Sequence, residues 1–232
     1  MNIRAAIFDK DGTLFDFQST WGVWTGLILA RIAGEDTALF EQLAQALKYD
    51  AQARKIMPGS VIVAGTPLEI AQNIQRFKSD MTVSEILNQL NEEAEHAPQV
   101  LVTDLRILTA KLRALGLQLS VMTNDAERPA RAHLAAAGAL QLFDHVIGSD
   151  SGFGAKPEAV PLLALAAKMD VPPACCVMVG DSQHDLHSGR EAGMRVVAVL
   201  TGLAGREELS SLADVVLPDV SHLPAWISAQ NS

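Results

Sequence analysis

The sequence has few cysteines and no long apolar run. Its two cysteines, Cys175 and Cys176, are adjacent, and neighbouring residues form only a strained disulfide. We therefore expect free thiols and a reducing compartment, with both residues entering a buried strand as small apolar side chains rather than acting as a redox pair or as metal ligands. No apolar run approaches the roughly 18 residues that a membrane-spanning helix needs, so none is expected.

Positive charge is scarce as well. Lysine and arginine number 18 against 27 aspartates and glutamates, which gives a formal net charge of −9. Nucleic acids and anionic membranes bind basic surfaces, so neither is expected as a main partner. The first residues carry one basic side chain before a charged cluster, which is not the pattern of a signal peptide. These features predict a cytoplasmic protein.

Apolar residues make up 49% of the chain and charged residues 19%. This balance excludes a disordered chain, and 232 residues can bury a core that needs no disulfide staples. Short apolar runs alternate with helical patterns, which predicts an α/β fold with a parallel sheet covered on both faces. The expected strands span residues 3–8, 117–122, 145–148, 176–179, 196–200 and 215–217. The expected helices span residues 100–115, 128–137, 159–169 and 184–192, with a short helix or coil after residue 222.

The stretch from about residue 17 to residue 98 has no convincing strand. Helical spacing recurs over residues 20–33, 36–53, 67–77 and 84–95, whereas the apolar run at 61–64 has no clear assignment. The simplest account is a helical module inserted after the first strand. The expected domains are therefore a core of residues 1–16 and 99–232 and an insert of residues 17–98.

The most specific motif follows the first expected strand. Asp9 and Asp11 stand two residues apart, and two carboxylates so close repel each other unless a cation lies between them. A divalent cation with oxygen ligands is the natural partner. Gly12 permits a tight turn whose backbone N–H groups can face an anion. An ordinary Asp-Gly surface turn is the alternative for this motif.

Three further clusters follow other expected strands. Thr123 and Asn124 can donate to phosphate oxygens, although both residues are also common in turns. Lys156 offers a positive charge, as any surface lysine does. Asp181 and Asp185 can face one site, or they can simply cap a helix. One parallel sheet would bring all the clusters to a single edge, and together they supply what phosphoryl transfer needs.

At these residues the sequence resembles the haloacid dehalogenase-like (HAD) hydrolase superfamily over nearly its whole length. The segment Asp-Lys-Asp-Gly-Thr at 9–13 looks like the first motif of that family, Thr123 the second, Lys156 the third and Gly-Asp-Ser-Gln-His-Asp at 180–185 the fourth. The helical insert resembles the cap of the phosphoglycolate phosphatase-like branch. The resemblance implies a Rossmann-like core, a mobile cap that closes over the site, and a small phosphorylated metabolite as the partner.

The resemblance also implies the role of each acidic residue. Asp9 would attack phosphorus and form an aspartyl-phosphate, and Asp11 would protonate the leaving oxygen and then activate water. Mg²⁺ would be held by Asp9, the backbone carbonyl of Asp11 and Asp181, with Asp185 supporting it directly or through water.

The remaining motif residues would bind the phosphoryl group. Thr123 and the N–H groups near Gly12 and Asn124 would contact the transferring oxygens, and Lys156 would offset the negative charge. The middle position of the first motif, commonly apolar in the family, is Lys10 here, and we expect its side chain to point away from Asp9 and Asp11.

The expected function is a Mg²⁺-dependent phosphatase for a phosphoglycolate-like compound or a sugar phosphate. A phosphomutase of the same branch is the alternative, and a catalytically silent module on the same fold is a third reading. Asp11 disfavours a dehalogenase, and neither Lys48 nor Lys55 is singled out as the extra lysine of a phosphonate hydrolase. Specificity is expected to depend on the cap, where Trp21 and Trp24 lie three residues apart and either line the substrate entrance or, as we expect, pack between helices. The cap cations that could read a substrate anion are Arg31, Arg54, Lys55 and Arg76.

Overall fold

The computed structural model describes residues 2–232 and contains a six-stranded sheet in which every neighbouring pair is parallel. The strand order is β5-β4-β1-β6-β7-β8. The strands are β1 (Ala5–Phe8), β4 (Gln118–Met122), β5 (His145–Ile147), β6 (Cys176–Gly180), β7 (Arg195–Val199) and β8 (Val215–Leu217). The α/β fold is confirmed, and each expected strand is found with small shifts at its ends.

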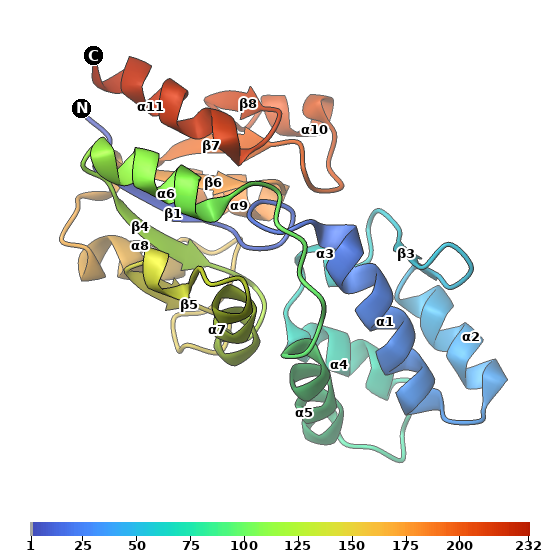
Figure 1. The fold of residues 1–232 in the computed structure, drawn as a ribbon. Helices are drawn as coiled ribbons and strands as arrows, with labels where there is room; N and C mark the ends of the chain where they lie inside the picture. The colour runs from blue at the N-terminus through green and yellow to red at the C-terminus, as the bar shows by residue number, and fades with distance from the viewer. Residues whose placement is uncertain (1) are drawn as a thin grey trace.

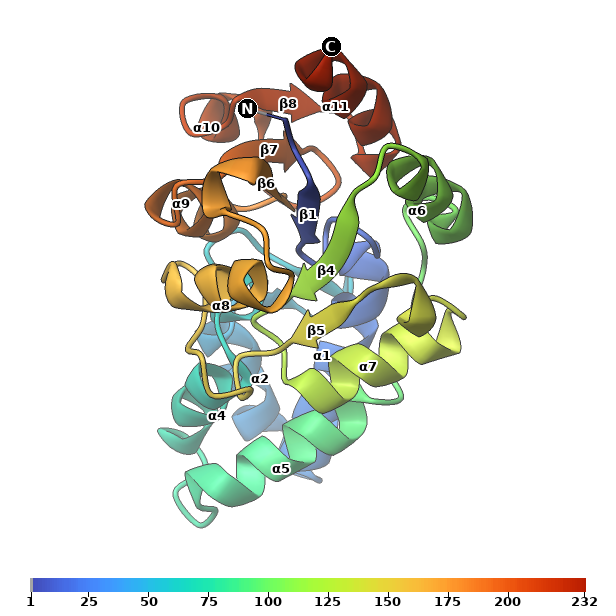
Figure 2. The same cartoon turned by 90° about the vertical axis from the view of Figure 1, so that its left-hand side faces the viewer.

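Helices cover both faces of this sheet, which explains why its strands are apolar throughout (Figure 2). The helices α6 (Leu105–Ala114), α7 (Glu127–Ala136) and α11 (Leu223–Asn231) pack on one face. The helices α8 (Val160–Lys168), α9 (Gln183–Glu191) and α10 (Arg206–Ser210) pack on the other. Successive residues of β1 alternate between the two cores. Three short 3-10 turns, Leu140–Leu142, Pro173–Cys175 and Val220–His222, complete this part of the chain.

The helix expected from residue 100 begins later, at Leu105. The Asp104 carboxylate accepts hydrogen bonds from the backbone N–H groups of Arg106 and Ile107 and caps the helix there. Both cysteines are free thiols, and Cys176 is buried at the start of β6, as expected. Cys175 does not enter the strand, because it is half-buried and ends the preceding 3-10 turn.

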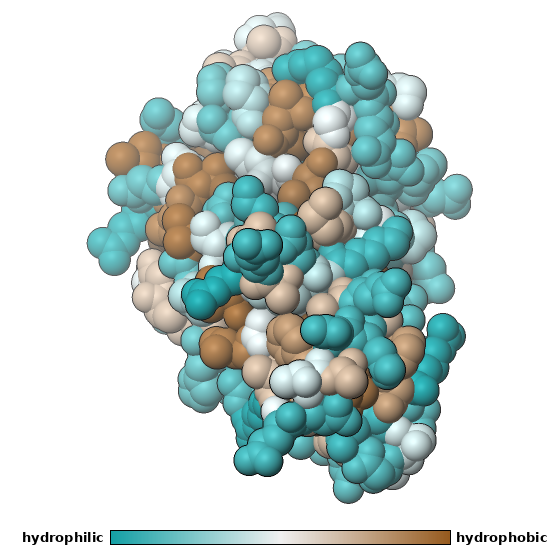
Figure 3. Space-filling model, turned by 90° about the vertical axis from the view of Figure 1, so that its right-hand side faces the viewer, coloured by the Kyte–Doolittle hydropathy of each residue, from teal (hydrophilic) through white to brown (hydrophobic). Residues whose placement is uncertain are grey.

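The helices between Phe17 and Ala94 share an apolar core of their own, and this helical unit lies beside the carboxyl ends of the strands (Figure 1). Its helices are α1 (Phe17–Ala33), α2 (Thr37–Ala46), α3 (Val61–Ala64), α4 (Pro67–Gln75) and α5 (Val83–Ala94). The apolar run at 61–64 is thus a single helical turn. The outer face of the molecule on this side is mainly hydrophilic, with apolar side chains in small scattered groups (Figure 3).

The expectation of one helix over residues 36–53 is wrong in its second half. There the chain forms an antiparallel ribbon of β2 (Tyr49–Asp50) and β3 (Lys55–Ile56). Lys48 and Arg54 both adopt a left-handed backbone conformation, with φ of 51° and 53°, which ends the helix and turns the chain. Among residues 2–232, no helix combines the length and the apolar character needed to cross a membrane.

Candidate active site

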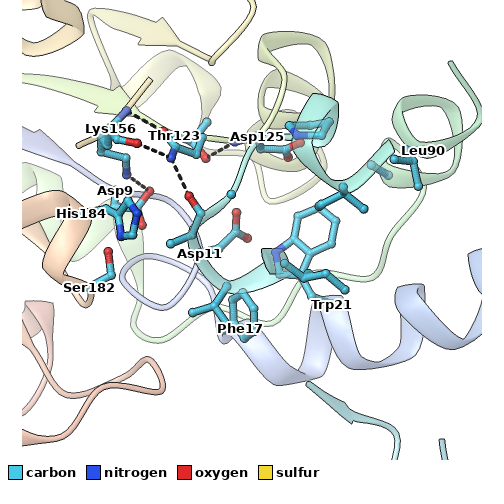
Figure 4. Close-up of a pocket in the computed structure, with 18 of the residues that line it drawn as sticks. Asp9, Asp11, Phe17, Trp21, Leu90, Thr123, Asp125, Lys156, Ser182 and His184 are labelled. Atoms are coloured by element: carbon cyan, nitrogen blue, oxygen red, sulfur yellow. Dashed lines mark hydrogen bonds and ion pairs between the residues drawn. The ribbon is translucent and has the colours of Figure 1, made fainter. Parts of the chain in front are cut away.

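A cavity lies between the helical unit and the carboxyl ends of the strands (Figure 4). Segments that follow four different strands reach it, and the one after β6 supplies Ser182 and His184. The loop after β1 supplies Asp9 and Asp11, the loop after β4 supplies Thr123, and the loop after β5 supplies Lys156. Asp181, directly after β6, borders an adjoining groove that shares Lys156. The structure therefore brings the four predicted clusters to one edge of the sheet.

Lys156 is the central cation of this site. Its buried Nζ lies 2.7 Å from Asp9 Oδ1 and 2.6 Å from Asp185 Oδ1. Burial alone would lower the pKa of Lys156, but the carboxylates of Asp185 and Asp9 raise it above its ordinary value. The ammonium group is therefore charged at any physiological pH, and it fixes the Asp9 carboxylate in place.

Three buried carboxylates crowd together next to this lysine. Oxygens of Asp9, Asp181 and Asp185 all lie within 4.8 Å of one another. Burial and the charge of Asp185 raise the pKa of Asp9 to about 7. Burial and the charges of Asp185 and Asp9 raise the pKa of Asp181. One lysine does not balance three negative charges, and an all-oxygen set suits a hard divalent cation such as Mg²⁺. The residues present fit the predicted metal.

Two glycines allow the backbone to approach Asp181. Gly12 has a φ of +79°, and a Cβ built there would lie 2.5 Å from Asp181 Cγ. A Cβ at Gly202 would lie 1.6 Å from Asp181 Oδ2. Thr201, beside Gly202, donates from Oγ1 to the carbonyl of Gly12 at 2.5 Å, which joins the two loops.

The loop containing Thr201 and Gly202 was not predicted as part of the site. The available signal was its position, because Thr-Gly follows the apolar strand β7 just as the other clusters follow theirs.

Ser182 is the N-cap of α9 and Asp185 is the third residue of that helix, so Asp185 has a helix-capping role beside the functional one. Its Oδ2 accepts from the Ser182 backbone N–H at 3.0 Å and from Ser182 Oγ at 2.7 Å, in a capping box. Its Oδ1 accepts from Lys156. Asp185 therefore ties the start of α9 to Lys156 and to the carboxylate cluster.

Thr123 and Asn124 serve the site in different ways. Thr123 Oγ1 accepts a hydrogen bond from the Asp125 backbone N–H at 3.1 Å, which leaves its own hydroxyl hydrogen to donate. The Asn124 side chain donates to the carbonyl oxygens of Lys156 and Ala64 at 2.8 and 2.7 Å, and it accepts from the Lys156 N–H at 2.9 Å. The Asn124 amide thus holds the Lys156 loop and the helical unit together.

The expectation that Lys10 points away from the acidic residues is wrong. Lys10 is fully buried, and its Nζ lies 2.9 Å from Asp11 Oδ2, 3.2 Å from Asp125 Oδ2 and 2.8 Å from His133 Nδ1. An ammonium group only donates, so His133 Nδ1 accepts and its Nε2–H donates to the Ala94 carbonyl at 2.6 Å. Burial and the Lys10 charge lower the pKa of His133 to about 4, so the ring is neutral.

This arrangement connects the helical unit with Asp11. Ala94 belongs to α5, and the Lys10 ammonium also lies 5.3 Å from the ring centre of Trp21 on α1. The Asp125 side chain is buried beside Lys10. Burial raises the pKa of Asp125 to about 6, against the opposing effect of Lys10.

The geometry can now be compared with known proteins. A family model described as haloacid dehalogenase-like hydrolase matches residues 3–193. The chain belongs to this family. A phosphoglycolate phosphatase from Rhodospirillum rubrum is 30% identical over 225 residues, covering 97% of this chain and 90% of that protein. A phosphoglycolate phosphatase from Escherichia coli is 27% identical over 240 residues, with coverages of 96% and 91%.

A solved structure has the same fold. The crystal structure of a predicted phosphoglycolate phosphatase from Haemophilus somnus matches with a TM-score of 0.73 at 20% identity, covering 97% of this chain and 98% of that one. Taken together, the matches make this HAD-like chain a phosphoric monoester hydrolase of the phosphoglycolate phosphatase-like branch.

Substitution of Gly202 tests whether this HAD-like site needs the close approach of the Gly202 backbone to Asp181. In Gly202→Ala the new methyl group would collide with Asp181 Oδ2, so we expect phosphatase activity to fall by at least about 100-fold as the carboxylate is displaced. Gly205→Ala is the matched control, because a Cβ there has nothing within 4 Å, and its activity should stay within about twofold of wild type. Equal activity of the two variants in a phosphate-release assay would contradict the assigned place of Asp181.

Proposed function

We propose that the chain is a Mg²⁺-dependent phosphatase that hydrolyses a small phosphomonoester through a phosphorylated Asp9. The observation that carries this proposal is the setting of the Asp9 carboxylate. It lines the cavity, it is held by Lys156 at 2.7 Å, and it belongs to a cluster of carboxylates that suits a divalent cation. A surface turn would need none of these features.

The reaction has two balanced steps. In the first, an Asp9 oxygen attacks phosphorus, the ester P–O bond breaks, and Asp11 gives a proton to the leaving alcohol. In the second, water attacks the phosphorus of phospho-Asp9 while Asp11 takes back a proton, which releases phosphate and restores Asp9. Asp11 is suited to both steps because it lies on the cavity with its carboxylate oriented by Lys10.

Other residues bind the phosphoryl group. The hydroxyl of Thr123 and the backbone N–H groups near Gly12 and Asn124 donate to its oxygens, and Lys156 offsets its charge. Asp9, the Asp11 carbonyl and Asp181 would hold the metal, with Asp185 supporting it directly or through water. Bound Mg²⁺ supplies positive charge that stabilises the transferring phosphoryl group.

The helical unit acts as the cap in this proposal, with residues 17–98 closing over a core of residues 1–16 and 99–232. Two hydrogen bonds support a closed arrangement, Asn124 to the Ala64 carbonyl and His133 to the Ala94 carbonyl, because each joins a core residue to the helical unit. Closure excludes water from the leaving group and from the charged oxygens.

Phosphate release from a panel of small phosphomonoesters, including phosphoglycolate and sugar phosphates, tests the proposal. We expect release with Mg²⁺ and its loss with EDTA. Unchanged release in EDTA would contradict the metal dependence. If no compound is hydrolysed, the same panel with a bisphosphate activator tests for a phosphomutase. No turnover in that assay either would favour a non-enzymatic module.

The affinity for Mg²⁺ should depend on pH. Asp9 has a pKa of about 7 without metal and must be ionised to bind it, so protons compete with Mg²⁺ below pH 7. We expect Mg²⁺ to bind at least about tenfold more tightly at pH 8 than at pH 6, because Asp181, another ligand with a raised pKa, adds to the effect of Asp9. Calorimetric titration measures this, and an affinity that is equal at both values would contradict the ligand role of Asp9.

A further inference from the structure

The side of the cavity that faces a leaving group is apolar and narrow. Phe17, Trp21 and Leu90 lie on the side away from Asp9 and Lys156 in Figure 4. Other cap residues that line it are Trp24, Ile62 and Ile70. The cavity has a volume of about 60 Å³, which suits a small leaving group.

No lysine or arginine of the helical unit lines this cavity, within the part of the chain that the structure describes. Arg31 forms an ion pair with Glu93, and Arg54, Lys55 and Arg76 are exposed to solvent. Within residues 2–232, the basic side chains that line the cavity are Lys156 and His184, which both come from the core on the Asp9 side.

Negative charge already borders the same cavity. Asp11 and Asp125 both line it, and the buried Lys10 between them supplies one positive charge for the two. A carboxylate or second phosphate on the leaving group would therefore lose its water against apolar side chains and meet like charges. Burial of an anion without a partner is strongly unfavourable.

Among the cap residues that line the cavity, two have a buried polar atom without a hydrogen-bond partner. The two atoms are Nε1 of Trp24, a donor, and Oδ1 of Asn91, an acceptor. Their helices, α1 and α5, pack against each other. A single neutral hydroxyl group can accept from an indole N–H and donate to an amide oxygen, so these atoms suit an uncharged polar group.

We propose that the substrate is the phosphate monoester of a small, neutral and largely apolar alcohol, whose one or two polar groups pair with Trp24 and Asn91. Esters with a carboxylate or a second phosphate on the leaving group are selected against. This inference rests on the proposed phosphatase function, because the apolar wall can select only among phosphoesters that the site hydrolyses.

Matched pairs of substrates test the preference. 2-Hydroxyethyl phosphate differs from phosphoglycolate by a neutral alcohol in place of a carboxylate, and propyl phosphate is compared likewise with 2-carboxyethyl phosphate. We expect kcat/KM for the neutral member of each pair to be higher by at least about 100-fold. An equal or higher value for the carboxylate members would overturn the inference and leave the phosphatase standing. Release from none of the four compounds or of the wider panel would instead overturn the proposed function.

A charged substitution in the cap tests whether this wall of the cavity causes the preference for neutral substrates. Asn91→Arg places a cation on the wall, whereas Asn91→Gln keeps a neutral amide and serves as the matched control. In the folded Arg variant we expect the ratio of neutral to carboxylate turnover to fall by about tenfold or more, and by clearly less in the Gln variant, which adds no charge. An unchanged ratio in a folded Arg variant would overturn the assignment of this wall, and if that variant does not fold, the wild-type ratio decides.

Discussion

The Asp9→Asn variant is expected to release phosphate at least about 10⁴-fold more slowly than wild type. An amide oxygen is a poor nucleophile, and the variant also loses one carboxylate of the metal cluster. Asparagine has nearly the same shape, so the fold should persist. Rates are measured with the best substrate of the panel at saturating Mg²⁺. A variant that retains activity near wild type would show that another group attacks phosphorus.

The same variant carries a stability signature that separates a functional acid from a structural one. The folded-state pKa of Asp9 is about 7, above its ordinary 3.8, so this carboxyl group weakens the fold progressively from about pH 4 to pH 7. In metal-free buffer at pH 8, the free energy of unfolding of Asp9→Asn, measured with urea, should therefore exceed that of wild type by roughly 2–4 kcal/mol. At pH 4 the two proteins should be equally stable. Asp170→Asn, at an exposed position, is the control and should change neither rate nor stability.

Replacement of Lys10 by methionine has the second largest expected effect. The ammonium group is fully buried and is shared by Asp11, Asp125 and His133. Its removal leaves two buried carboxylates without their cation, which should cost about 3–5 kcal/mol of stability. We also expect kcat to fall by about 100-fold, because Asp11 loses its orienting partner. Urea unfolding and steady-state kinetics measure the two effects.

A charge-balanced double variant distinguishes electrostatics from packing. Lys10→Met combined with Asp125→Asn removes one charge of each sign, so it should recover part of the lost stability without recovering kcat. Lys78→Met, which breaks a surface pair with Asp80, is the matched control and should cost at most about 1 kcal/mol. Full activity in Lys10→Met would contradict the role given to this residue.

Much of the core could be predicted from the sequence because its signals are local. Buried parallel strands leave continuous apolar runs, and the functional clusters follow those runs directly. The predicted carboxylates, lysine and threonine therefore meet at one edge once the strands pair, as β1 does with β4 and β6. Helix ends were less predictable, since a single cap such as Asp104 decides where a helix begins.

The contacts between core and cap could not be predicted, since they depend on tertiary packing. Lys10 was expected to point away from Asp11, but β1 ends at Phe8, so the alternation of a strand does not continue through the turn. The lysine then bends toward Asp125 and His133, which lie far away in sequence. The β2–β3 ribbon was missed for a similar reason, as Lys48 and Arg54 take left-handed conformations that ordinary residues rarely adopt.

Direct capture of the phosphorylated enzyme tests the central claim of the account. The protein is quenched in acid during turnover with Mg²⁺, digested at low pH, and its peptides are examined by mass spectrometry. We expect the peptide that contains Asp9 to gain the mass of one phosphoryl group, with fragmentation placing it on Asp9, and Asp9→Asn to show no such peptide. Turnover without any phosphorylated peptide, or with the phosphoryl group on a different residue, would contradict the assignment of Asp9 as the nucleophile.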